Sequence, residues 1–156
     1  FQKTELITRK WFLMVENGNS IVVDASIILA WLCPDETVVE EVNKLFERSV
    51  MGEIDFVAPG LLRYEVWNGL RSMVLRKRMD SGLVFEALSR FESLPISFYG
   101  QEADGELILT TALREGLTAY DGAYLVLARS LDCELMSSDT LLAQKKSGKK
   151  GDGGGD

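Results

Sequence analysis

The chain has 156 residues, of which 46% are hydrophobic and 26% are charged, a composition typical of a single soluble globular domain. It contains no histidine, which excludes Ser-His-Asp and Cys-His nucleophilic machinery and leaves carboxylates, lysines, hydroxyl groups or a metal ion as candidate catalysts. The formal net charge of −7 argues against a uniformly basic nucleic-acid-binding protein, but it allows one with local basic patches.

Neither a membrane span nor a secretory signal is indicated. The longest apolar run, "SIVVDASIILAWLC", is interrupted by Asp24 and is shorter than the roughly 18 residues that a span requires. The two cysteines, Cys33 and Cys133, lie in apolar contexts without a CxxC partner, so we expect buried free thiols and no zinc site. These features predict a cytoplasmic protein with no membrane partner.

The chain is expected to hold one domain between two end segments. Residues 1–20 lack clean periodicity, and we expect an N-terminal extension that is either native or added for expression. Residues 147–156 are rich in Gly, Lys and Asp, which is typical of a disordered tail. The predicted domain spans residues 21–146.

Within the domain, short apolar runs alternate with helical periods. Strands are predicted at residues 21–24, 54–59, 95–99 and 133–138. Helices are predicted at residues 25–33, 35–52, 60–79, 80–94, 101–116 and 117–130. We expect Asp80 or Ser81 to cap the fourth helix and Gly116 to end the fifth. Strands separated by helices predict an α/β fold, a three-layer α/β/α sandwich with a central, mainly parallel sheet.

Four acids stand out by their places in this pattern. Asp24 ends the first strand and Asp139 follows the last, at the sheet edge where open α/β folds build their sites. Glu65 flanks the apolar stripe of its helix. Asp121 shares a helical face with apolar residues one and two turns later. All four are therefore candidates for one site.

Each acid also has a purely structural explanation, and singly that explanation is the commoner one. Asp24 and Asp139 could cap the helices that follow, Thr118 and Asp121 fit a capping box, and Glu65 could be solvated. Together, however, four acids at one edge would repel each other, and a hard divalent cation is their natural partner. Such a site would suit metal-assisted phosphodiester hydrolysis.

Four short motifs carry these acids in order along the chain. They are "VVDASIILAWLCPDE" with Asp24 and Ser26, "APGLLRYEVWNGL" with Glu65 and Asn68, "LTAYDGAYLVLA" with Asp121, and "LMSSDTLLA" with Ser137 and Asp139. With these motifs in their predicted strand and helix contexts, residues 20–146 resemble the PIN domain, and specifically the VapC-type toxins of bacterial and archaeal toxin–antitoxin pairs.

The resemblance implies an endoribonuclease dependent on Mg²⁺ or Mn²⁺, usually a homodimer, that a cognate antitoxin protein holds inactive. Asp24, Glu65 and Asp121 would be catalytic and carry the metal, with Asp139 as a more variable fourth acid. The accessory residues would be Ser26, Asn68 and Ser137, of which the two serines would orient the carboxylates or bind metal-held water.

RNA is compatible with the local charge pattern, although the overall charge is acidic. Basic residues gather at Arg71, Arg76, Lys77 and Arg78, and again at Lys145, Lys146, Lys149 and Lys150. Either group could contact phosphates, but a solvated helix end and a charged tail explain them at least as well. The aromatic residues Tyr64, Trp67 and Tyr120 could stack on bases, and core packing is the favoured interpretation.

Other functions stay open. The chain could be an RNA-processing nuclease outside a toxin–antitoxin pair, or a non-catalytic interaction module. An aspartyl-nucleophile phosphatase fits less well, because Ser26 stands where that pattern has a second aspartate.

Overall fold

Four strands form a parallel sheet at the centre of a computed structural model, which describes residues 20–35, 40–100 and 104–139. The strands are β1 (Ser20–Val23), β2 (Asp55–Pro59), β3 (Ile96–Tyr99) and β4 (Glu134–Met136). They lie in the order β3-β2-β1-β4, and each neighbouring pair is parallel. The predicted parallel sheet is confirmed.

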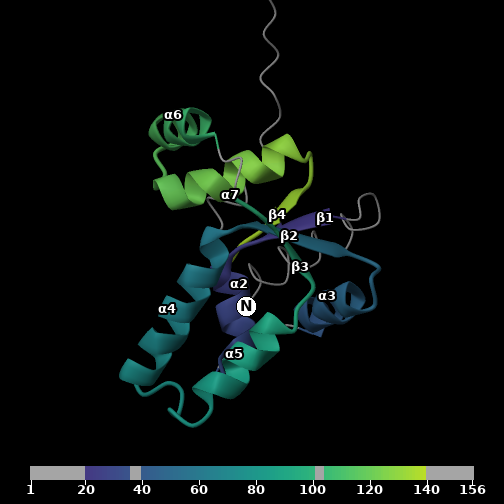
Figure 1. Ribbon diagram of the computed structural model, residues 1–156, viewed down its shortest axis with the longest axis vertical. Helices are drawn as coiled ribbons and strands as arrows, with labels where there is room; N and C mark the ends of the chain where they lie inside the picture. Colours follow the sequence, from purple (N-terminus) through teal and green to yellow (C-terminus); the bar gives the residue numbers. More distant parts are fainter. Residues whose placement is uncertain (1–19, 36–39, 101–103, 140–156) are drawn as a thin grey trace, which may run out of the picture.

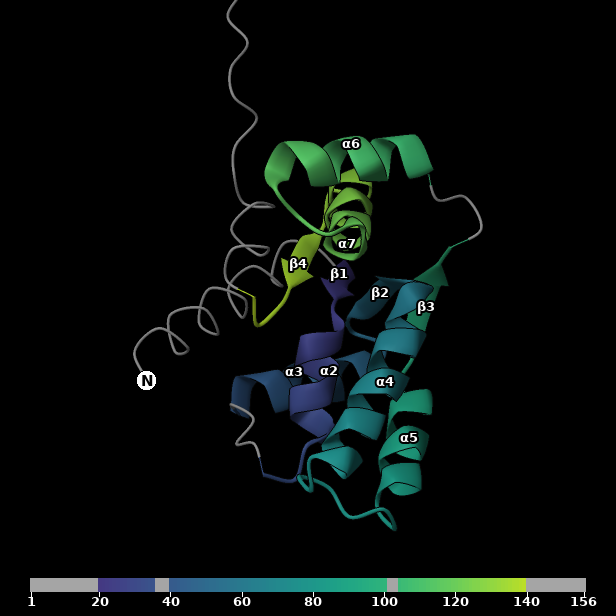
Figure 2. The ribbon, with the colours of Figure 1, turned by 90° about the vertical axis from the view of Figure 1, so that its left-hand side faces the viewer.

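Helices cover both faces of this sheet. They are α2 (Ala25–Leu32), α3 (Glu40–Val50), α4 (Leu61–Leu75), α5 (Val84–Glu92), α6 (Gly105–Glu115) and α7 (Ala119–Ser130). Figures 1 and 2 show α2 to α5 on one side of the sheet and α6 and α7 on the other. Helix α7 packs directly on β1, β2 and β4, and α6 packs on α7. The three-layer sandwich is therefore confirmed.

The central strand β1 is apolar along its length because helices cover both of its faces. Val22 and Val23 are both 0% exposed, and Val22 lies opposite Val57 of β2 and Leu135 of β4. A strand buried on both faces reads as a continuous hydrophobic run instead of an alternating one. The next residue, Asp24, is thus carried to the carboxyl edge of the sheet.

The strand order reverses between β1 and β4. From β1 the chain moves outward to β2 and β3, then returns through α6 and α7 to place β4 on the other side of β1. Open α/β sheets bind ligands at the carboxyl ends of strands beside such a reversal. Asp24 follows β1 there, and Ser137 follows β4.

Several predicted helix boundaries were wrong. The long helix ends at Leu75 and not at residue 79, because Lys77 adopts a left-handed conformation with φ of 58°. The next helix begins at Val84, and Asp80 does not cap it; its Oδ1 instead accepts a turn hydrogen bond of 2.7 Å from the Gly82 N–H. The predicted end of the following helix is confirmed, since Gly116 terminates α6 with φ of 67°.

Some predictions lie outside the described residues, namely those for the N-terminal extension, for the tail with its four lysines, and for the ends of the helices predicted at 35–52 and 101–116. No helix in the described ranges has the length and apolar character needed to cross a membrane. Cys33 and Cys133 are buried free thiols, as predicted.

Candidate active site

Asp24 lies at the point where β1 passes into α2. Its backbone N–H donates to the Met136 carbonyl at 3.1 Å, extending the pairing of β1 with β4 by one residue. Its Oδ1 accepts hydrogen bonds from the N–H groups of Ser26 at 3.0 Å and Ile27 at 3.3 Å. Asp24 is therefore the N-cap of α2, as one of the two explanations for this residue predicted.

Burial shapes the protonation of this carboxyl group. Asp24 is only 7% exposed, and burial raises its pKa because the charged form loses solvation. Hydrogen bonds from the Ser137 and Ser26 side chains and from the two N–H groups act in the opposite direction. The carboxylate is thus held by neutral donors in a poorly solvated place.

Two serines connect Asp24 to the turn after β4. The Ser26 hydroxyl donates to Oδ1 of Asp24 at 2.5 Å and accepts from the Ser138 N–H at 3.0 Å. The Ser137 side chain also hydrogen-bonds to Asp24, and its Oγ accepts from the Asp139 N–H at 3.0 Å. Ser26 and Ser137 therefore lie where an orienting role for this acid requires them.

Glu65 projects from α4 beside the buried stripe formed by Leu62, Val66, Leu70 and Met73. Its Oε1 accepts a 2.6 Å hydrogen bond from the hydroxyl of Tyr124, a residue of α7. Burial raises the pKa of Glu65, the Tyr124 hydrogen bond opposes this, and the charges of Asp24 and Asp121 raise it further. The three acids therefore interact electrostatically, although they come from three separate elements.

Asp121 lies in the first turn of α7, on the helix face that also carries the buried Tyr124 and Leu125. Its backbone N–H donates to Oγ1 of Thr118 at 3.1 Å, and the Thr118 hydroxyl donates to its Oδ2 at 2.9 Å. Thr118 is thus the N-cap of α7 and also fixes the Asp121 carboxylate.

The other predicted site residues are more peripheral. Asp139 is exposed at the turn after β4, and Asn68 is exposed on α4 close to Glu65. Of the basic residues, Arg76 and Arg78 line a pocket between α2 and α4, while Arg71 lines a different groove and Lys77 is exposed.

The interpretation of three aromatic residues as core was wrong. Tyr64, Trp67 and Tyr120 are 71%, 41% and 66% exposed. Tyr64 and Trp67 pack edge to face against each other, with ring centroids 5.2 Å apart. They lie on the side of α4 that faces away from the core.

Sequence reasoning placed Tyr124 only among apolar core residues and missed its hydroxyl. The side chain is 2% exposed, and burial together with the Glu65 carboxylate raises its pKa, so the hydroxyl is a firm donor. The available signal was its position three residues after Asp121 in "YDGAY", which places both on one helical face.

The donor set at this edge consists of hard carboxylate oxygens, which suits Mg²⁺ or Mn²⁺. Within the described residues, no three Asp, Glu, His or Cys side chains lie close enough to hold one ion in this arrangement. The charges of Asp24 and Asp121 raise the pKa of Glu65, so the three carboxylates lie within electrostatic range of one another. Hydroxyls and backbone N–H groups hold them there, and such a set of acids fits a divalent cation.

Known proteins resemble this chain over most of its length. A family model described as PIN domain matches residues 21–147. Ribonuclease VapC3 of Pyrobaculum aerophilum is 33% identical over 129 residues, which cover 80% of this chain and 93% of that protein. Ribonuclease VapC9 of Mycobacterium tuberculosis is 31% identical over 123 residues, covering 79% of this chain and 88% of that protein. The solved structure of PAE2754 from Pyrobaculum aerophilum shares the fold, with a TM-score of 0.65 at 23% identity, over 83% of this chain and 81% of that one.

Proposed function

The chain belongs to the PIN-domain family, and we propose that it is a metal-dependent endoribonuclease acting as the toxin of a toxin–antitoxin pair. The observation that carries this proposal is the gathering of Asp24, Glu65 and Asp121 beside the reversal of strand order. Burial and the charges of Asp24 and Asp121 raise the pKa of Glu65, and this unfavourable electrostatic energy is of the kind that a bound cation offsets. Ribonuclease names among the similar proteins support RNA as the substrate.

Asp24, Glu65 and Asp121 would hold Mg²⁺ or Mn²⁺, with Asp139 as a fourth acid. A bound ion of this kind supplies a water molecule of lowered pKa and compensates charge on phosphoryl oxygens. Neutral hydrogen-bond donors of the chain hold these acids in position. Ser26 and Ser137 orient Asp24, Tyr124 orients Glu65, and Thr118 orients Asp121, so each of these three acids has a positioning hydroxyl.

Cleavage of RNA by the purified chain tests the proposal. We expect cleavage of total cellular RNA in Mn²⁺ or Mg²⁺ and none in EDTA. Asp24→Asn and Glu65→Gln should abolish it, while Glu47→Gln, which neutralises an exposed acid on α3, should leave it unchanged. Undiminished cleavage by Asp24→Asn, purified in the same way, would exclude this site and indicate a contaminating nuclease.

Two other functions make different predictions. A non-catalytic module would show no heat of Mn²⁺ binding in calorimetry. An aspartyl phosphatase would hydrolyse a small phosphate ester in preference to RNA; this is disfavoured because Ser26, in place of a second aspartate, is bonded to Asp24. An RNA-processing nuclease would cleave RNA but would lack a neighbouring gene for an inhibitory protein.

We further propose a homodimer and a cognate antitoxin as partners, with the cytoplasm as the place of action. Exposed apolar side chains support additional contact surfaces, since Leu113 of α6 is 76% exposed and Phe85 of α5 is 74% exposed. Light scattering of Leu113→Glu and Phe85→Glu would test the dimer. Co-purification with the product of the adjacent gene would test the antitoxin, and a monomer that inhibits growth without any such gene would contradict both.

A further inference from the structure

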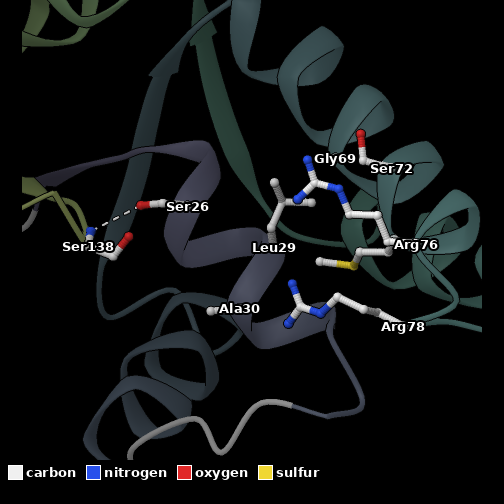
Figure 3. Close-up of a pocket in the computed structure, with 9 residues that line it drawn as sticks. Ser26, Leu29, Ala30, Gly69, Ser72, Arg76, Arg78 and Ser138 are labelled. Atoms are coloured by element: carbon white, nitrogen blue, oxygen red, sulfur yellow. Dashed lines mark hydrogen bonds between the residues drawn. The ribbon is translucent and has the colours of Figure 1, made fainter.

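A pocket of about 340 Å³ lies between α2 and α4, next to the turn that carries Asp24. Ser26 and Ser138 line one end of it, and Arg76 and Arg78 line the other (Figure 3). Ser26 is also bonded to Asp24, so one side chain belongs both to the pocket wall and to the site. Whatever occupies the pocket would therefore lie next to the reacting phosphodiester.

The pocket follows one face of α4. Glu65, Gly69, Ser72 and Arg76 recur at helical spacing and so share that face. Arg76 lies eleven residues after Glu65, about 16 Å along the helix axis. Its side chain runs back toward the start of the helix, and Figure 3 shows its guanidinium beside Gly69 and Ser72, facing the pocket. The guanidinium of Arg76 thus lies closer to the acidic site than the position of Arg76 at the end of α4 would suggest.

The two arginines differ in their charge balance. Arg78 donates to the Asp35 carboxylate from Nε, at 3.0 Å to Oδ2, and from Nη2, at 2.9 Å to Oδ1. Its Nη2 also donates to Sγ of Cys33 at 3.4 Å. Arg76 makes no side-chain hydrogen bond or ion pair with any residue that the structure describes. The positive charge of Arg76 is therefore available to a ligand in the pocket, whereas the guanidinium of Arg78 is held in place by Asp35.

We propose that this pocket binds a backbone phosphate of the RNA adjacent to the phosphodiester that is cut, with Arg76 as its ligand and Ser72 as a further donor. This rests on the proposed ribonuclease function. A guanidinium matches the geometry of a phosphate and stays charged at every physiological pH. The RNA strand then runs from the acids along α4 toward Arg76. Ser26 lines the pocket and also hydrogen-bonds to Asp24. This favours RNA as the occupant over an acidic side chain of an inhibitor protein, because the RNA substrate must itself reach Asp24.

Binding measurements on the inactive Asp24→Asn protein isolate this contact from catalysis. Fluorescence anisotropy with a labelled single-stranded oligoribonucleotide of mixed sequence would give the dissociation constant over a range of salt. We expect Arg76→Gln to weaken binding roughly fivefold or more and to reduce the slope of log K against log salt by about 0.7, the loss of one phosphate contact on a single strand. In the active protein the same change should raise KM more than it lowers kcat.

Two other arginines control for general loss of charge. Arg48→Gln removes a half-buried cation of α3 that pairs with Glu53, and we expect no change in affinity or slope. Arg71→Gln removes a cation from the same helix, about 140° around it from Arg76. A loss for Arg71→Gln equal to that for Arg76→Gln would overturn the assignment to this pocket.

Oligonucleotides with a single neutral methylphosphonate linkage give the most direct test. Moved along the strand, this linkage should weaken binding to the parent protein at one position near the cleavage point, and Arg76→Gln should abolish that sensitivity. Sensitivity that persists in Arg76→Gln would refute the proposal, as would normal RNA binding combined with lost affinity for the antitoxin. If the parent chain cleaves no RNA, the proposed function has failed; if it cleaves and Arg76→Gln behaves like the parent, only the phosphate site has failed.

Discussion

Replacing Asp24 with Asn is expected to stabilise the metal-free protein while it abolishes catalysis. Asp24 is 7% exposed, and burial raises its pKa above the ordinary value. A group whose pKa is higher in the folded state favours folding when protonated and opposes it when ionised, so at neutral pH the charge costs stability. Asn removes the charge and keeps the cap of α2, since its amide oxygen can accept from the Ser26 and Ile27 N–H groups.

The expected gain is about 1 kcal/mol, the usual size for relief of a destabilised functional position, which raises Tm by about 3–5 °C in a domain of this size. Asp24→Ala should gain nothing, because the lost cap costs about 1 kcal/mol as well. A divalent ion at 100 times its dissociation constant would add about 2.7 kcal/mol to the parent protein. Excess Mn²⁺ should therefore reverse the order of the parent and Asp24→Asn.

Urea and thermal unfolding in EDTA and in excess Mn²⁺, followed by circular dichroism, would measure both effects. Lower stability of Asp24→Asn than of the parent in EDTA would contradict this prediction, because the hydrogen bonds to the carboxylate would then outweigh the cost of its burial. Equal stabilisation of both proteins by Mn²⁺ would show that the ion binds away from Asp24.

Three further substitutions test single features of the structure. Tyr124→Phe removes the donor to Glu65, so we expect kcat to fall about tenfold and the free energy of unfolding by about 1 kcal/mol, measured by RNA cleavage and urea unfolding. The Arg78 guanidinium lowers the pKa of Asp35 to about 2, so this pair stabilises the fold above pH 4. That contribution should disappear between about pH 4 and pH 2, and Asp35→Asn should remove this part of the pH dependence of the urea midpoint. Gly116→Ala places a residue with a side chain in the left-handed conformation that ends α6, and it should lower the free energy of unfolding in urea by about 1 kcal/mol.

Each change has an outcome that would contradict it. An unchanged kcat for Tyr124→Phe would show that Glu65 needs no fixed donor. An identical acid limb for Asp35→Asn and the parent would mean that the Arg78 pair adds nothing to folding. Gly105→Ala, at an open position of α6 without a left-handed backbone, is the control for Gly116→Ala, and an equal loss from both would remove the conformational explanation.

The order of strands and helices could be predicted because the local signals agreed with the final packing. The run "IVV" is apolar without alternation, and β1 is covered on both faces. The end of α4 could not be predicted in the same way, because residues 76–79 have good helix propensity. The helix stops where Met79 turns inward to a 5% exposed position, and this tertiary contact leaves no local signal.

Within the candidate site, the places of Asp24, Glu65 and Asp121 in their strands and helices could be predicted from the sequence, but their hydrogen-bond partners could not. The hydroxyl of Tyr124 meets Glu65 across 59 residues of sequence, and because α4 and α7 lie on opposite sides of the sheet (Figure 2), only the complete fold brings the two side chains together. The exposure of Tyr64 and Trp67 was mispredicted for a related reason. Helical spacing shows which residues share a face, whereas the fold decides which face meets the core.

A helix cap and the proposed metal-binding role, which the sequence left open as alternatives, do not exclude each other. Asp24 caps α2 through Oδ1, and Asp121 lies in the first turn of α7 under its cap Thr118. A helix N-terminus stabilises a carboxylate through its unpaired N–H groups and its dipole, without adding a positive side chain that would compete with a metal ion. A buried acid that must stay available for a cation is therefore best held by N–H and hydroxyl donors, and the capping geometry provides them.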